Sequence, residues 1–158
     1  MKKLLLAGAM FLASLTSSFA ADPVKVGFVY VGPVGDHGWT YRHDIGRQQV
    51  EEALGDQVET SYIESVAYGP EAERVFREMA ETHDIVFGTS FGYMDPVINV
   101  AKKFPKVKFE HATGYKTADN VSTYSARFYE GRSVIGLSLI HISEPTRRRG
   151  ISYAVFCL

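Results

Sequence analysis

Several features that would place the chain in a special class are scarce or absent. The only cysteine among the 158 residues is Cys157, so an internal disulfide framework is excluded. Lys and Arg total 17 against 18 for Asp and Glu, a balance that excludes a strongly basic nucleic-acid binder. Hydrophobic residues make up 46% and charged residues 22%, which excludes a disordered tail. The remaining possibility is an ordinary globular domain.

The first twenty residues have the layout of a secretory signal peptide. Lys2 and Lys3 precede an apolar run over 4–15, and Ser18 and Ala20 supply small residues before a cleavage point ahead of Ala21. The apolar run is only about a dozen residues long, whereas a membrane span needs ~20. We therefore predict cleavage near Ala20, export and a periplasmic location.

The end of the chain has a different origin from the rest. Residues 137–158 resemble the in-frame translation of a transposase-type sequencing adapter, interrupted by a short index at 148–150. We therefore expect a non-native tail after Gly136 and a native segment over 21–136. That segment contains no cysteine and carries more acidic than basic side chains, which disfavours thiol chemistry and nucleic-acid binding.

Strand and helix patterns alternate along the native segment. Runs of β-branched and aromatic residues predict strands, and apolar residues at helical spacing predict helices. The expected strands are 24–31, 58–63, 84–88, 107–111 and 121–126; the expected helices are 41–54, 70–83, 95–104 and one from Glu130 onward. Short connections between alternating elements predict an α/β domain, a parallel sheet with helices on both faces. Ligands of such sheets bind beyond the carboxyl ends of the strands.

The loop after the first strand is the first candidate binding segment. It reads Gly-Pro-Val-Gly-Asp-His-Gly-Trp-Thr-Tyr over 32–41. An exposed Trp39 there can stack on a flat ring, and Asp36 can accept hydrogen bonds from it. An ordinary core role for Trp39 and a helix-capping role for Asp36 remain open. The glycine spacing matches no dinucleotide fingerprint, so a dinucleotide enzyme using Glu64 is a distant alternative.

The segment Gly88-Thr-Ser-Phe-Gly92 offers a different chemistry. It matches the G-x-S-x-G elbow of hydrolases and lies between a strand and a helix. A secreted serine hydrolase would use Ser90 with His111 and with Asp95 or Asp119. The alternative is a tight turn that presents backbone N–H groups and Phe91 to a ligand. The scattered histidines form no metal-ligand motif, so we predict no metal and no cofactor.

Four stretches together resemble one protein family. They are Gly-Asp-His-Gly-Trp-Thr-Tyr at 35–41, Thr-Ser-Phe-Gly-Tyr-Met-Asp at 89–95, Phe-Glu-His-Ala-Thr-Gly-Tyr at 109–115 and Arg-Phe-Tyr-Glu-Gly-Arg at 127–132. The chain resembles the basic-membrane-protein (BMP) family of ABC-transporter substrate-binding proteins, which includes purine-nucleoside receptors. The resemblance implies one lobe of a type I periplasmic binding fold, with the second lobe largely missing.

The resemblance also implies a function without catalysis. A purine such as adenine, or a nucleoside, would be held by aromatic stacking and delivered by a monomeric protein to an ABC permease at the inner membrane. Many relatives read Asp-Lys-Ser-Phe-Asn where this chain has residues 36–40, so Trp39 replaces the stacking Phe and Thr40 an Asn. The ligand-binding residues predicted from pattern and resemblance together are Asp36, Trp39, Thr40, Ser90, Phe91, Gly92, Tyr93 and Phe128.

Overall fold

The computed structural model describes residues 22–142, except the side chains of Asp36 and 138–142. The predicted signal peptide and residues 143–158 of the predicted tail lie outside the described residues. Strands and helices alternate along the chain, with short 3-10 turns between them. The elements are β1 (Val24–Val29), η1 (Val34–Asp36), α2 (Trp39–Leu54), η2 (Gly55–Gln57), β2 (Val58–Ile63), α3 (Pro70–Thr82), β3 (Ile85–Gly88), η3 (Phe91–Tyr93), α4 (Met94–Ala101), β4 (Lys108–Ala112), β5 (Val121–Tyr124) and α5 (Phe128–Ile142).

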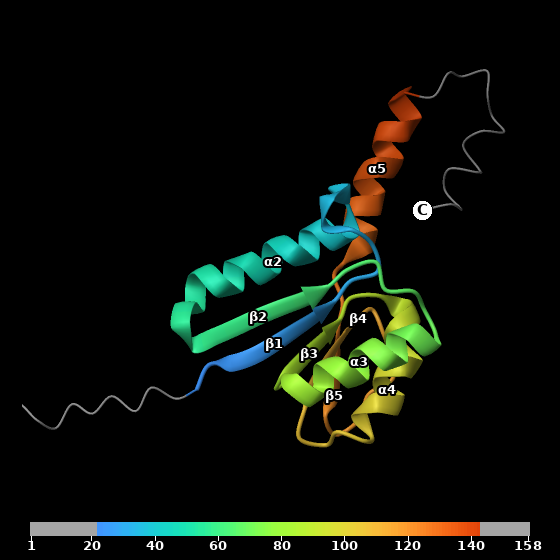
Figure 1. The fold of residues 1–158 in the computed structure, drawn as a ribbon. Helices are drawn as coiled ribbons and strands as arrows, with labels where there is room; N and C mark the ends of the chain where they lie inside the picture. The colour runs from blue at the N-terminus through green and yellow to red at the C-terminus, as the bar shows by residue number, and fades with distance from the viewer. Residues whose placement is uncertain (1–21, 143–158) are drawn as a thin grey trace, which may run out of the picture.

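The five strands form one parallel sheet in the order β2-β1-β3-β4-β5. Helix α2 lies on one side of this sheet and α3 and α4 on the other, while α5 projects away from it (Figure 1). The predicted α/β lobe with a parallel sheet and helices on both faces is therefore confirmed. Strand β1 lies inside the sheet, between β2 and β3, which explains why Val26, Phe28 and Val29 are all buried.

The α3 and α4 side holds the larger core. In α3 the buried residues are Ala72, Val75, Phe76, Met79 and Ala80, as the helical spacing predicts. They pack with Val29, Val86, Val97 and Phe109 in one cluster. On the other face, Val50 and Leu54 of α2, two apolar residues at helical spacing, are 37% and 42% exposed.

Five helix boundaries differ from the predicted ones. Helix α3 ends at Thr82 and α4 begins at Met94, each one residue from the predicted position, and local geometry explains two of the other three differences. Helix α2 begins at Trp39 rather than Tyr41 because Gly38, with φ −106° and ψ −134°, provides the non-helical residue before it. Helix α4 ends at Ala101 rather than Phe104, where the amide of Asn120 donates to the carbonyls of both residues at 3.2 and 3.0 Å. Helix α5 begins at Phe128, before Glu130.

Candidate functional site

The candidate site lies at the carboxyl edge of the sheet, where the strand order reverses. From β1 the chain moves to β2 on one side, and β3 lies on the other side of β1. In open parallel sheets this reversal leaves a crevice in which ligands bind. The indole Nε1 of Trp39 donates a 2.6 Å hydrogen bond to the carbonyl of Thr89, joining the loops that follow β1 and β3. The side chain of Thr89 is itself anchored on the carbonyl of Val29.

Trp39 is fixed by this bond but not covered. It remains 39% exposed, and its ring lies 5.8 Å from that of Phe128 at an interplanar angle of 41°. Phe128 is 40% exposed and comes from the first position of α5. The structure therefore brings together two aromatic residues that the sequence analysis selected from segments almost ninety positions apart.

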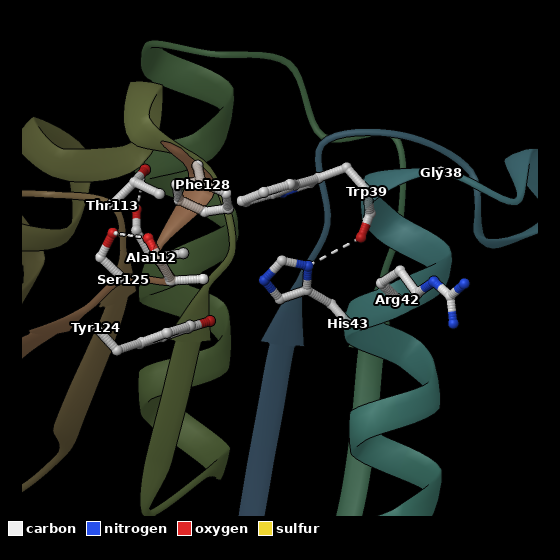
Figure 2. A pocket seen from close by; sticks show the side chains of 10 residues that line it. Gly38, Trp39, Arg42, His43, Ala112, Thr113, Tyr124, Ser125 and Phe128 are labelled. Carbon is white, nitrogen blue, oxygen red and sulfur yellow. Dashed lines mark hydrogen bonds between the residues drawn. The ribbon is translucent and has the colours of Figure 1, made fainter. Parts of the chain in front are cut away.

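These two rings border a pocket of about 510 Å³. It opens between the first turns of α2 and the ends of β4 and β5 (Figure 2). Apolar and aromatic groups dominate its lining, with few polar side chains, which is the usual make-up of a small-molecule site. The lining residues are Gly38, Trp39, Arg42, His43, Ala112, Thr113, Tyr124, Ser125, Ala126 and Phe128.

The sequence analysis missed three lining residues whose role depends on tertiary structure. His43 lies one turn after Trp39, and its Nδ1 is 2.9 Å from the Trp39 carbonyl. Its i+4 spacing from Trp39 was the signal that could have found it. Tyr124 closes the opposite side, and burial, with the nearby charge of Glu110, raises its pKa to about 12. Tyr124 is therefore a neutral phenol at physiological pH.

Thr113, the third of these residues, carries local backbone strain. Its φ of 65° lies in the left-handed region, which is uncommon for a β-branched residue. Its N–H donates to the Tyr124 carbonyl at 2.7 Å and its hydroxyl to the Ala112 carbonyl at 2.6 Å, so both ends of the residue are held. Strained backbone that is held in this way clusters at ligand sites.

Ser90 belongs to a network next to the pocket rather than to a catalytic triad. Its hydroxyl shares a 2.9 Å hydrogen bond with the Tyr68 hydroxyl, and its carbonyl accepts one from Nε2 of His111 at the same distance. His111 therefore binds the backbone of Ser90 and not its hydroxyl. Asp95 pairs instead with Lys116 at 2.6 Å. This geometry does not support the serine hydrolase alternative.

The other residues of the G-x-S-x-G segment have separate surroundings. Phe91 is 55% exposed, and its ring lies 6.3 Å from that of Tyr115, outside the lining of the pocket. Gly92 packs under Tyr68, because a Cβ at this position would lie 2.6 Å from the Tyr68 ring. This contact requires glycine, so Gly92 has a packing role whether or not its N–H meets a ligand.

Two further predicted binding residues, Tyr93 and Thr40, have side chains that do not line the pocket. Tyr93 is fully buried, and its hydroxyl donates to the Val66 carbonyl at 2.7 Å, so it belongs to the core. Thr40 is 1% exposed, and its Oγ1 accepts a 3.2 Å bond from the N–H of Gly32, which fixes the loop after β1. The backbone of Asp36 ends η1, and its side chain lies outside the described residues.

The fold is similar to that of solved ABC-transporter solute-binding proteins. One from Aeropyrum pernix K1 superposes with a TM-score of 0.64 at 23% identity, over 73% of this chain and 32% of that protein. A second solute-binding protein, from Conexibacter woesei, superposes with a TM-score of 0.57 at 22% identity, over 65% of this chain and 35% of that protein. At such low identity these likenesses establish the fold alone.

The sequence comparisons define the family. Residues 23–146 match the Bmp family, described as ABC transporter substrate-binding protein PnrA-like. The chain belongs to this family. A purine-binding protein of Brucella abortus is 57% identical over 137 residues, which cover 86% of this chain and 38% of that protein. A Haloferax volcanii relative named as an ABC transporter glucose-binding protein, TsgA13, is 43% identical over 78% of this chain and 31% of its own length.

The match thus spans only 38% and 31% of the lengths of these two curated relatives. Over residues 22–142, no helix combines enough length and hydrophobicity to cross a membrane. Within the same residues, no group of three or more His, Cys, Asp or Glu side chains is arranged to hold a metal ion.

Proposed function

We propose that the full-length protein is the extracytoplasmic binding component of an ABC importer and that this lobe holds a purine base or nucleoside. The observation that carries the proposal is that Trp39 and Phe128 lie next to each other at the border of a largely apolar pocket at the sheet's carboxyl edge. The purine-binding relative from Brucella abortus, which is 57% identical, supports the choice of ligand.

Stacking and burial supply the main binding energy in this proposal. A flat ring held between two others needs about 7 Å between their planes, since carbon atoms in contact are ~3.5 Å apart. The present Trp39–Phe128 centroid distance is 5.8 Å, so Phe128 must move outward to admit a purine. It can do so with the start of α5, which projects from the sheet (Figure 1). Trp39, tied to Thr89, stays in place.

Four other predicted residues take supporting roles in the proposal. Asp36, Ser90, Phe91 and the Gly92 N–H border the same edge of the sheet and would contact a ligand enclosed by a second lobe. Closure of two lobes would then be recognised by a permease, and no bond in the ligand would be made or broken. Mass spectrometry of ligand released after binding tests this point; a chemically altered ligand would contradict it.

Calorimetry follows ligand binding to the full-length protein, and tryptophan fluorescence, to which Trp39 contributes, gives a second readout. We expect saturable quenching and binding heat with adenine, guanine or adenosine on the full-length protein. Trp39→Phe should retain binding, because it keeps an aromatic face, and Trp39→Ala should weaken it at least tenfold. Glucose is the control ligand, chosen because one relative is named for it. Binding of glucose and of no purine would overturn the proposal.

We further propose that residues 1–20 are removed on export and that residues 137–158 are not native. Amino-terminal sequencing of the secreted protein should begin at Ala21. The family match continues to residue 146, past the proposed junction at Gly136, so the tail needs a direct test. Resequencing the source DNA supplies one, and recovery of the same tail in frame would show that it is native.

A further inference from the structure

His43 points one unused ring nitrogen into the pocket. Its ring centroid lies 4.8 Å from that of Trp39 and 6.5 Å from that of Tyr124, so the imidazole occupies the space between the two aromatic walls. Figure 2 shows the ring directed into this space, whereas the neighbouring Arg42 side chain points away. Within the part of the chain that the structure describes, the hydrogen bonds of His43 involve Nδ1 only.

The bond made by Nδ1 determines what Nε2 can do. Nδ1 faces a backbone carbonyl, which can only accept, so Nδ1 must carry the proton. In neutral imidazole the second nitrogen is then an acceptor with an unused lone pair. The helix fixes this arrangement, because the carbonyl belongs to Trp39, four residues before His43. Nε2 is therefore a preorganised acceptor next to the Trp39 ring.

Four other polar side chains belong to the lining, and among them the Tyr124 hydroxyl can donate or accept. The guanidinium of Arg42 offers donors only. The hydroxyls of Thr113 and Ser125 donate to the backbone carbonyls of Ala112 and Ala126 at 2.6 and 3.4 Å. A heterocycle stacked on Trp39 would place one edge toward His43. An N–H or amine on that edge would pair with Nε2, whereas an acceptor there would face a lone pair.

We infer that His43 is a specificity-determining residue that accepts a hydrogen bond from an N–H donor on the edge of a purine ligand. The inference rests on the proposed function and deepens it, because it selects purines that present such a donor. Adenine has donors at its exocyclic amine and its imidazole N–H, whereas 9-methylpurine has the same fused ring and no N–H at all. The pair of ligands separates hydrogen bonding from stacking.

The test is a cycle of two ligands and three proteins, all full length. His43→Phe keeps a flat ring between Trp39 and Tyr124 but removes the acceptor, and His43→Gln retains one. We expect His43→Phe to weaken adenine binding about tenfold, as for loss of one hydrogen bond, and to leave 9-methylpurine binding within about twofold. His43→Gln should recover part of the loss with adenine. Isothermal titration calorimetry measures all six dissociation constants.

Nitrogen NMR of the wild-type protein gives a readout that needs no variant to fold. With ¹⁵N-labelled histidine, adenine should shift the Nε2 resonance of His43 in the direction of a hydrogen-bonded nitrogen, and 9-methylpurine should not. Equal losses for both ligands in His43→Phe, or an Nε2 resonance that adenine leaves unchanged, would overturn the role of His43 while purine binding stands. Failure of the wild type to bind either ligand would overturn the proposed function as well.

Discussion

The two faces of the sheet are built in different ways. The face under α3 and α4 is an apolar core in which Phe76, Val86 and Phe109 have no exposed surface. On the α2 face the buried apolar residues are Val26, Phe28 and Tyr30, beside an open groove of about 550 Å³. Helix α2 carries Trp39 and His43, so the less densely packed face is the one that positions the candidate site.

Polar contacts hold α2 where apolar packing is sparse. Asp44, 3% exposed, accepts hydrogen bonds from Arg47 and Gln48 at 2.7 Å and from the Tyr30 hydroxyl at 3.3 Å. Burial alone would raise the pKa of Asp44, but the bonds from Arg47 and Gln48 and the Arg47 charge outweigh it and lower the pKa. Directional hydrogen bonds, rather than a large apolar core, therefore position the part of α2 that carries the candidate site.

The first prediction targets the core face and carries the largest effect. Phe76→Ala removes a fully buried ring that packs edge-on against Tyr93 at 5.4 Å between centroids. We expect it to lower the free energy of unfolding by about 3–5 kcal/mol, because the lost transfer energy adds to the cost of a cavity. Urea denaturation measures this. Tyr129→Ala, at a position 65% exposed, is the control and should change stability by less than about 0.5 kcal/mol.

The second prediction targets the network of the α2 face. Asp44→Asn removes the charge of one of the two carboxylates that hold the half-buried Arg47 guanidinium and leaves only Glu51 at 2.9 Å, so we expect a loss of about 2 kcal/mol in unfolding free energy. The emission of Trp39 should also move, because the first turns of α2 lose their anchor. Glu78→Gln, in a pair with Arg74 whose side chains are 53% and 59% exposed, should cost at most about 0.5 kcal/mol. Equal losses in the two variants would contradict a directional anchor.

The third prediction concerns His111, a polar group buried at the site edge of the core face. Burial lowers its pKa, and the bond to the Ser90 carbonyl offsets this only in part. The unfolded chain therefore binds a proton below its ordinary pKa of 6.5 while the folded chain does not. Stability from this residue is complete above that pH and is lost as pH falls below it.

Urea denaturation across pH 5–8 measures this linkage. His111→Gln can still donate to Ser90 but does not titrate, so the decline in unfolding free energy toward low pH should be smaller in the variant than in the wild type. Subtracting the two profiles removes the contributions of the other histidines. Parallel profiles would contradict a buried, neutral His111.

The sequence predicted the core face better than the α2 face, and the reason is physical. Helical spacing identifies a buried stripe only when a partner covers it, as α4 and the sheet cover Val75 and Phe76 of α3. In α2 the apolar residues at helical spacing include Val50 and Leu54, which residues 22–142 cover only in part, leaving them 37% and 42% exposed. Periodicity predicted the strands, and short connections predicted their parallel order.

A site residue was predictable from the sequence where its position after a strand is enough to place it at the site. Trp39 and Phe128 follow strand ends, and parallel strands bring their carboxyl ends to one edge. Tyr93 was selected by the same rule, but η3 turns it into the core, where its hydroxyl finds the Val66 carbonyl. His43 was missed because its role in the pocket depends on which of its ring nitrogens bonds to the Trp39 carbonyl. Residue type alone does not reveal that bond.

The fourth prediction has the smallest effect and sharpens the contrast between the faces. Leu54→Ala removes a leucine that lines the open groove and is 42% exposed, whereas the same truncation in a closed core costs about 2–5 kcal/mol. We expect a loss below about 1 kcal/mol in the 158-residue chain, because the neighbouring groove is already open and no new cavity forms. Urea denaturation of Leu54→Ala and Phe76→Ala, measured side by side, compares their losses of unfolding free energy. A loss comparable with that of Phe76→Ala would mean that the α2 face is packed as tightly as the core, and the polar network would then be redundant as the anchor of α2.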